Sequence, residues 1–255
     1  MFQLFYNLII IISFIVGATI LVTQINESII KINDNQILMY NQPNLQIDQS
    51  NKNEEEQSEI DKKQELKNKL KGKHQEIIIE KEIVKTITGN NKIYRNIYVP
   101  NQTKITEIDI LFITPMGIYV IESKNYDANI YGYEKNLNWL AFYHGKKYIM
   151  PNPIIQNRQH IKYLKKYLKI PEKYFKSIIV FNDNANLYKV PKSCDKYTIC
   201  YLRNLNRTIL NLMIEYDHSI KDININQIKK DLAPIINASD ELKEKHKIRI
   251  KNKYE

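Results

Sequence analysis

Two apolar segments joined by a short turn constrain the fold of this chain more than any other sequence feature. Residues 106–125 read TEIDILFITPMGIYVIESKN, and both faces of each segment are apolar on either side of the PMG turn. Strands that are apolar on both faces lie in the middle of a sheet that is covered on each side. The sequence therefore predicts a central, buried β-hairpin, in which any charge must be paired or bound to a metal.

Charged side chains stand at the far ends of this hairpin, where Asp109, Glu122 and Lys124 occur. With the turn centred just after Pro115, residue i faces residue 231 − i, so Asp109 faces Glu122. Side chains that face each other across a strand pair have Cβ atoms about 5 Å apart. The alternative is a bulge at Gly117, which would slip the register by one residue and place the two carboxylates on opposite faces.

Two facing carboxylates repel each other unless a proton or a divalent cation lies between them. Hard oxygen ligands of this kind suit Mg²⁺ or Mn²⁺ rather than zinc, and a neighbouring lysine can stabilise developing negative charge. The pattern indicates phosphodiester hydrolysis at a divalent cation held between the two carboxylates. The alternative is a structural network in which Lys124 forms ion pairs with Glu107 and Asp109.

Further strand-like runs and helical patterns surround the hairpin and indicate the fold class. Helical patterns cover about 58–89, 153–169, 203–217 and 222–233, and the first carries Ile79, Ile83 and Ile87 on one stripe with Glu76 at its edge. This order of elements predicts an α/β (α+β) domain with a central mixed sheet flanked by helices. Besides the hairpin, we expect strands at Ile93–Val99, Ala128–Tyr133, Leu137–Tyr143, Ser177–Asn182 and Tyr197–Leu202.

The basic residues are concentrated in the second half of the chain. Residues 1–144 contain 15 Lys and Arg against 17 Asp and Glu, whereas residues 145–255 contain 23 against 11. A basic region of this size favours a polyanion, and we expect nucleic acid, with DNA ahead of RNA. The predicted helix after Asn152-Pro153 carries four lysines that we expect to contact phosphates, the alternative being a solvated helix face: Lys162, Lys165, Lys166 and Lys169.

The first residues of the chain resemble a membrane anchor. Residues 4–23 are almost entirely apolar, and no charge appears before Glu27. A helix of this length spans the hydrocarbon core of a bilayer. A cleaved signal peptide is the alternative, but its basic leading region is missing here. Lys31, the only basic residue close to the run, favours a membrane protein whose soluble domain faces the cytoplasm.

The composition divides the chain into five segments. We expect an N-terminal transmembrane helix within 1–23, a flexible polar linker at 24–57, a domain core at 58–182, a C-terminal strand and helical extension at 183–240, and a charged tail at 241–255. The two cysteines, Cys194 and Cys200, exclude a disulfide scaffold and a cysteine-rich zinc module.

Four separated blocks of the sequence resemble the nuclease-related domain family, which is assigned to the PD-(D/E)xK nuclease superfamily. The blocks are TEIDI, GIYVIESKN, the pair Gly132 and Trp139, and NPIIQN with His160. The resemblance runs from about Lys71 to Asn182. It implies a restriction-endonuclease-like sheet with Asp109 and Glu122 as ligands of a divalent metal and Lys124 as the catalytic lysine.

The resemblance also implies two supporting site residues outside the hairpin. These are Glu76 on the first helix and Gln156 on the helix after the strands. The family usually has Gly-Glu at the first of these places, where this chain has Gln75-Glu76. The sequence therefore predicts a membrane-anchored, magnesium-dependent nuclease, and its alternative is a tethered module that binds nucleic acid or a partner without cutting.

Overall fold

The computed structural model of the chain describes residues 49–101, 104–215 and 223–254. The predicted anchor at 4–23 and most of the predicted linker at 24–57 lie outside these residues. In the part that is described, no helix combines the length and the apolar character needed to cross a bilayer. Residues from Lys62 onward form one compact unit, which contains both sheets and every predicted site residue.

A five-stranded mixed sheet forms the centre of this unit. Its order is β1 (Lys92–Asn101), β2 (Lys104–Thr114), β3 (Gly117–Lys124), β7 (Phe175–Phe181) and β9 (Thr198–Tyr201). The first three strands pair antiparallel, whereas β3, β7 and β9 run parallel. The predicted central mixed sheet is confirmed, and the hairpin of β2 and β3 lies in its middle.

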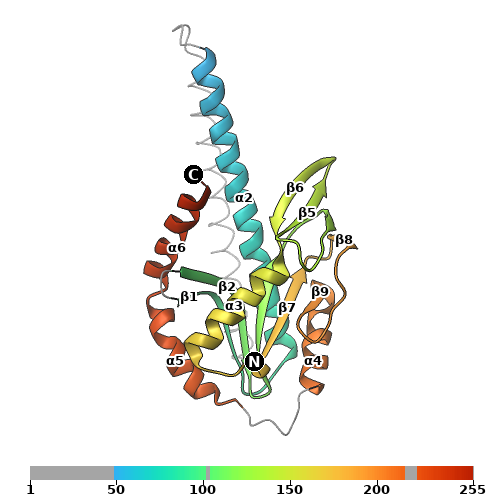
Figure 1. Cartoon of the computed structure of the whole chain (residues 1–255), viewed down its shortest axis with the longest axis vertical. Coiled ribbons are helices and arrows are strands. Elements are labelled where there is room, and N and C mark those ends of the chain that lie inside the picture. Colours follow the sequence, from blue (N-terminus) through green and yellow to red (C-terminus); the bar gives the residue numbers. More distant parts are fainter. Residues whose placement is uncertain (1–48, 102–103, 216–222, 255) are drawn as a thin grey trace, which may run out of the picture. The chain divides into compact units, whose positions relative to one another are not determined.

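Helices cover both faces of this sheet (Figure 1). Helices α3 (Pro153–Leu168) and α5 (Ile225–Asn237) pack on one face, and α2 (Gln49–Thr86) and α4 (Leu205–Ile214) pack on the other. A last helix, α6 (Ser239–Tyr254), follows α5 and contacts β1 and β2. Each face carries its own hydrophobic core, because the apolar hairpin supplies side chains to both. A third core cluster surrounds Trp139.

Helix α2 differs from its prediction at both ends. It begins at Gln49, inside the stretch predicted as a linker, rather than near residue 58. It ends at Thr86 rather than at Gly89, although Gly89 does have a positive φ of 101°. The predicted apolar stripe is confirmed, since Ile79, Ile83 and Ile87 are all buried.

A second sheet, which the sequence analysis did not predict, packs beside the first. Its order is β6 (Lys146–Pro151), β5 (Asn138–Tyr143), β4 (Asn129–Tyr131) and β8 (Asn186–Lys189). Trp139 is fully buried under this sheet, where its ring stacks on Phe181. A Cβ atom on Gly132 would lie 2.1 Å from the Trp139 ring, so only glycine fits at that position. Two short 3₁₀ helices, Glu172–Tyr174 and Leu202–Asn204, complete the unit.

Candidate active site

The hairpin has the register that its sequence predicts. Ile110 pairs with Ile121 and Thr114 pairs with Gly117, so the residue numbers of each pair add up to 231 and no bulge slips the strands. Asp109 lies one residue beyond the pair of Ile110 and Ile121, at the end of the hairpin away from the turn. Its Oδ2 accepts a hydrogen bond of 2.8 Å from the backbone N–H of Ser123. The Asp109 carboxylate therefore lies at the level of Glu122, at the carboxyl end of β3.

Glu122 is the most enclosed acid of the site, since its side chain is only 1% exposed. Its Oε1 forms an ion pair of 2.7 Å with Lys124 Nζ, and its Oε2 lies 3.0 Å from His160 Nε2. Burial alone would raise the pKa of Glu122, but the positive charge of Lys124 and the hydrogen bond to His160 outweigh it and lower the pKa. Glu122 is therefore held as a carboxylate.

Helix α3 supplies two partners to this pair because its first turn is fixed by a cap. The Asn152 side chain accepts hydrogen bonds from the backbone of Ile154 and Ile155, as the Asn-Pro pair predicts. Gln156 follows in the first turn, and its Oε1 accepts a hydrogen bond of 3.0 Å from Lys124 Nζ. His160 lies one turn further along the same side of the helix.

Of the two histidines His144 and His160, only His160 is a site residue, and the sequence pointed to it only through the family resemblance. Its ring is buried and bridges two groups, Glu122 on one nitrogen and the Thr106 hydroxyl, at 2.6 Å, on the other. The available signal was its spacing of four residues from Gln156, which places both side chains on one helix face. The other histidine considered, His144, is exposed in the turn between β5 and β6.

The pKa of Asp109 is shifted in the opposite direction from the pKa of Glu122. Burial and the adjacent negative charge of Glu122 raise the pKa of Asp109 well above its usual value, against the opposing effect of Lys124 and the Ser123 N–H. Two carboxyls with divergent pKa values therefore share one site. This is the pattern expected of facing carboxylates that lack a cation between them.

Glu76 approaches the sheet from α2 and is buried rather than solvated. It is 9% exposed, and burial raises its pKa to about 7, partly offset by a hydrogen bond with Asn96. Its Oε2 is buried and has no hydrogen-bond partner. The negative charge of Glu76 also contributes to the raised pKa of Asp109.

Asn96 is a site residue that the sequence analysis missed. It adopts φ 53°, a left-handed conformation that asparagine tolerates better than most residues. Its neighbours Arg95 and Ile97 pair with Ile110 and Ile108, so Asn96 stands across the strand pair from Asp109. An asparagine within a strand-like run gives no sequence signal of a site residue, because the left-handed conformation that directs its side chain depends on tertiary packing.

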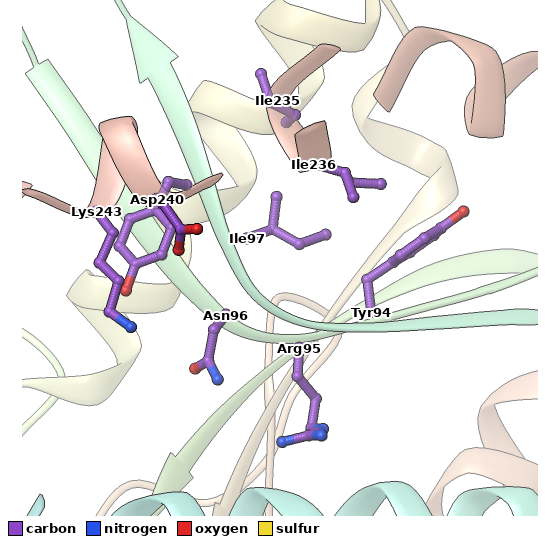
Figure 2. A pocket seen from close by; sticks show the side chains of 9 residues that line it. Tyr94, Arg95, Asn96, Ile97, Ile235, Ile236, Asp240 and Lys243 are labelled. Atoms are coloured by element: carbon purple, nitrogen blue, oxygen red, sulfur yellow. The ribbon is translucent and has the colours of Figure 1, made fainter. Parts of the chain in front are cut away.

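This left-handed residue lets two successive side chains of β1 face the same way. Figure 2 shows Arg95 and Asn96 directed away from Ile97 and Ile236, on the opposite side of β1. Arg95 forms an ion pair with Glu80 of α2, and Asn96 bonds Glu76 on the same helix. In a regular strand the two side chains would point to opposite faces.

A pocket of about 240 Å³ lies against β1, α5 and α6, and Arg95 and Asn96 are among the residues that line it. Ile97, Ile235 and Ile236 line it together with Tyr94 and polar side chains. None of the five predicted catalytic residues lines this pocket. The candidate site is therefore the polar cluster at the end of β3 rather than the pocket.

The four predicted phosphate-binding lysines lie further along α3. At 1.5 Å per residue, positions 162 to 169 are about 9 to 20 Å from Gln156 along the helix axis. Lys165 forms an ion pair with Glu172, and Lys166 donates a hydrogen bond of 3.3 Å to Asn101. Lys162 is exposed and is the closest of the four to the cluster.

The donor set of the cluster fits a hard cation in its chemistry. Its acidic members, Asp109, Glu122 and Glu76, offer carboxylate oxygens, and the buried Oε2 of Glu76 has no partner. A carboxylate has about four lone-pair positions, so Lys124 and His160 leave part of the Glu122 acceptor capacity free. Even so, the described residues contain no group of three His, Cys, Asp or Glu side chains already arranged to hold a metal ion.

Three further residues from the sequence analysis have structural places. Trp139 packs in the core and donates a hydrogen bond to the carbonyl of Tyr133. Cys194 is exposed, Cys200 is buried, and both are free thiols.

One comparison with known proteins covers the segment that contains the cluster. Residues 71–182 match the model of the nuclease-related domain family, and this segment contains every residue of the cluster. An uncharacterized protein of Bacillus anthracis is 29% identical over 142 residues, which cover 55% of this chain and 66% of that protein. The chain thus spans just under two thirds of the length of this relative.

A solved structure also matches, at low similarity. The structure of Pyrococcus furiosus SfsA in complex with Ca²⁺ is 24% identical, with 58% of this chain and 52% of that chain covered. The TM-score is 0.25, so this likeness contributes nothing to the site.

Proposed function

We propose that the nuclease-related domain formed by residues 71–182 hydrolyses phosphodiester bonds with the help of a divalent cation, Mg²⁺ or Mn²⁺. We expect DNA as the substrate ahead of RNA. We further propose a restriction-endonuclease-like fold, with residues 4–23 anchoring the domain to a membrane and the domain on its cytoplasmic side. The family match supports a nuclease-related role, and the chemistry of the cluster supports a divalent cation. The apolar run at residues 4–23 supports the membrane anchor, and the basic second half of the chain supports a nucleic acid substrate.

One observation carries this proposal, the buried charge at the end of the central hairpin. Glu122 and Lys124 form an ion pair at 2.7 Å inside the protein, next to an Asp109 whose pKa is strongly raised. Burying such groups is costly, and purely structural cores avoid it. Carboxyls with divergent pKa values and a lysine within hydrogen-bond reach are typical of catalytic sites.

Each residue of the cluster has a role that its contacts support. Asp109 and Glu122 would hold the cation, with Glu76 completing its surroundings. When bound, the cation would polarise the scissile phosphate and lower the pKa of the attacking water. Lys124 Nζ supplies positive charge for the developing negative charge of the phosphate oxygens.

Gln156 and His160 position these groups rather than act on the substrate. Gln156 accepts a hydrogen bond from Lys124 Nζ and limits the directions in which the ammonium can point. His160 lies between Thr106 and Glu122 and fixes the orientation of the Glu122 carboxylate. Such fixed orientation keeps the charges in place for the reaction.

A second candidate function rests on the same contacts. Both oxygens of Glu122 already have cationic or hydrogen-bonding partners, Lys124 and His160. The negative charge of Glu122 is therefore already balanced, and the site would keep its geometry without a cation. This favours, as the alternative, a tethered module that binds nucleic acid without cutting it.

A cleavage assay on the purified full chain, kept in mild detergent, tests the proposal. Linear, circular and single-stranded DNA are incubated with Mg²⁺, Mn²⁺ or EDTA. We expect cleavage that requires the cation and that falls by about 10²- to 10³-fold or more in Asp109→Ala and in Lys124→Ala. Cleavage of circles would identify an endonuclease.

Lys173→Ala, at a lysine outside the cluster, is the matched control and should cleave like the wild type. Circular dichroism establishes that each variant is folded. Equal activity in Asp109→Ala and the wild type would exclude the proposed site. Salt-sensitive binding without any cleavage would support the binding module instead.

A further inference from the structure

The second sheet presents an outward surface of aromatic and aliphatic side chains. Trp139 and Ala141 of β5 are buried, so the alternating residues Leu140 and Phe142 point to the other side. Register partners on β4 and β6 lie on the same side as these two. We call this surface the outer face and define it by Tyr131, Leu140, Phe142, Ile149 and Tyr188.

The outer face lies apart from the hydrophobic cores of the described residues. None of its five side chains belongs to any of the three core clusters there. Ile149 is 68% exposed and Tyr188 is 62% exposed. Apolar side chains that gather on one exposed face mark a surface for interaction.

The aromatic rings of the outer face are arranged to accept another flat ring. Tyr131 and Tyr188 stack with their centroids 5.4 Å apart and their planes at 6°. Phe142 meets Tyr131 edge to face at 5.5 Å. Because Tyr188 is exposed, one face of this stack remains available, and base–aromatic stacking is strong and tolerant of sequence.

The charge of the second sheet indicates the partner. Its four strands contain three lysines and no aspartate or glutamate. Lys147 pairs in register with Phe142 on the outer face. Lys189 follows Tyr188 and pairs with Tyr131 at an irregularity in the register of β4 and β8. Alternating rings and ammonium groups match the bases and phosphates of a nucleic acid strand.

We propose that the outer face binds single-stranded nucleic acid, with bases stacked on Tyr188 and Phe142 and phosphates beside Lys147 and Lys189. A duplex hides the flat faces of its bases, so it fits this surface less well. The inference goes beyond the proposed function, because no residue of the candidate active site lies on this face.

The chain connects this surface to the candidate active site. Lys124 and the first residue of β4, Asn129, are five residues apart, which is at most about 18 Å. The β5–β6 hairpin leads directly through Asn152 into α3, which carries Gln156 and His160. A strand held on the outer face would therefore lie close to the cluster.

Fluorescence anisotropy with the full chain tests this inference. The probes are fluorescein-labelled 15-mers of oligodeoxythymidylate and oligouridylate and a DNA duplex of equal length, in EDTA so that no cation-dependent cleavage interferes. We expect Tyr188→Ser to weaken binding of both single strands about 10-fold, and Tyr188→Phe to retain it. Comparison of the two single strands distinguishes DNA from RNA.

Tyr148→Ser is the matched control, because Tyr148 is also exposed but pairs with Ala141 on the other side of the sheet. Unchanged affinity in Tyr188→Ser, an equal loss in Tyr148→Ser, or tighter binding of the duplex would each overturn the inference. Because binding is measured without cleavage, a chain that never cuts DNA still gives a decisive result.

Discussion

Glu76 couples pH to the stability of the domain. Its pKa rises from 4.5 to about 7 on folding, chiefly through burial. An acid whose pKa is raised by folding opposes the folded state when it is ionised. The penalty is absent below about pH 4.5, grows as the pH rises, and is complete above about pH 7.

Replacing Glu76 by glutamine removes this ionisation. We expect Glu76→Gln to have a larger free energy of unfolding than the wild type at pH 8, by on the order of 3 kcal/mol. The gain should disappear near pH 4. Urea unfolding in EDTA between pH 4 and 8 measures it, with the exposed Glu172→Gln as control, and a gain that does not depend on pH would contradict the assignment.

Some residues of the candidate site were predictable and others were not. Asp109, Glu122 and Lys124 were visible because charge is rare in segments that are apolar on both faces. The structure brings Gln156 into direct contact with Lys124. Asn96 and His160 could not be predicted as site residues. The left-handed conformation of Asn96 and the bridging position of His160 arise only when the strands and α3 pack together.

At the scale of elements, the local sequence pattern was sufficient to predict a strand where that strand is buried. The turn predicted the register of β2 and β3, and the pairing of Thr114 with Gly117 excludes the bulge that was its alternative. Strands β6 and β8 were missed. Both are short and largely exposed, and β8 pairs in parallel with the distant β4, so neither shows a local alternating pattern.

Asn152 joins two elements, and its loss should cost more than an ordinary helix cap. Its side chain caps α3 and also donates hydrogen bonds to the carbonyls of Tyr133, Glu134 and Asn136. We expect Asn152→Ala to lower the free energy of unfolding by about 3 kcal/mol. Urea unfolding at pH 7 measures the loss.

Asn224 provides the comparison, since it caps α5 by accepting a hydrogen bond from the backbone of Gln227. We expect Asn224→Ala to cost about 1 kcal/mol, as for a simple cap. If both variants lose the same free energy, the hydrogen bonds from Asn152 to the carbonyls contribute nothing.

At the scale of the whole molecule, the uneven charge should make nucleic acid binding depend on salt. Residues 145–255 carry 23 basic and 11 acidic side chains. Each phosphate contact adds about 0.9 to the slope of log K against log salt on duplex DNA. We expect the double variant Lys162→Gln and Lys166→Gln to lower this slope by about 2 in anisotropy titrations of duplex DNA in EDTA.

Lys229→Gln with Lys230→Gln on α5 removes the same charge from another helix and is the control. Both of these lysines are exposed. If the two double variants change the slope equally, the lysines of α3 act only through net charge and not through phosphate contacts.

The ion pair inside the hairpin has a consequence for how this domain reaches its folded state. Lys124 acts as a built-in counter-ion for Glu122, at 2.7 Å, so the interior already balances one of its negative charges. We expect such a domain to fold without a bound cation, unlike small metal-dependent modules that unfold when the ion is removed. We expect chelation to abolish the proposed cation-dependent cleavage while the domain stays folded, so that the supply of cation would control activity alone.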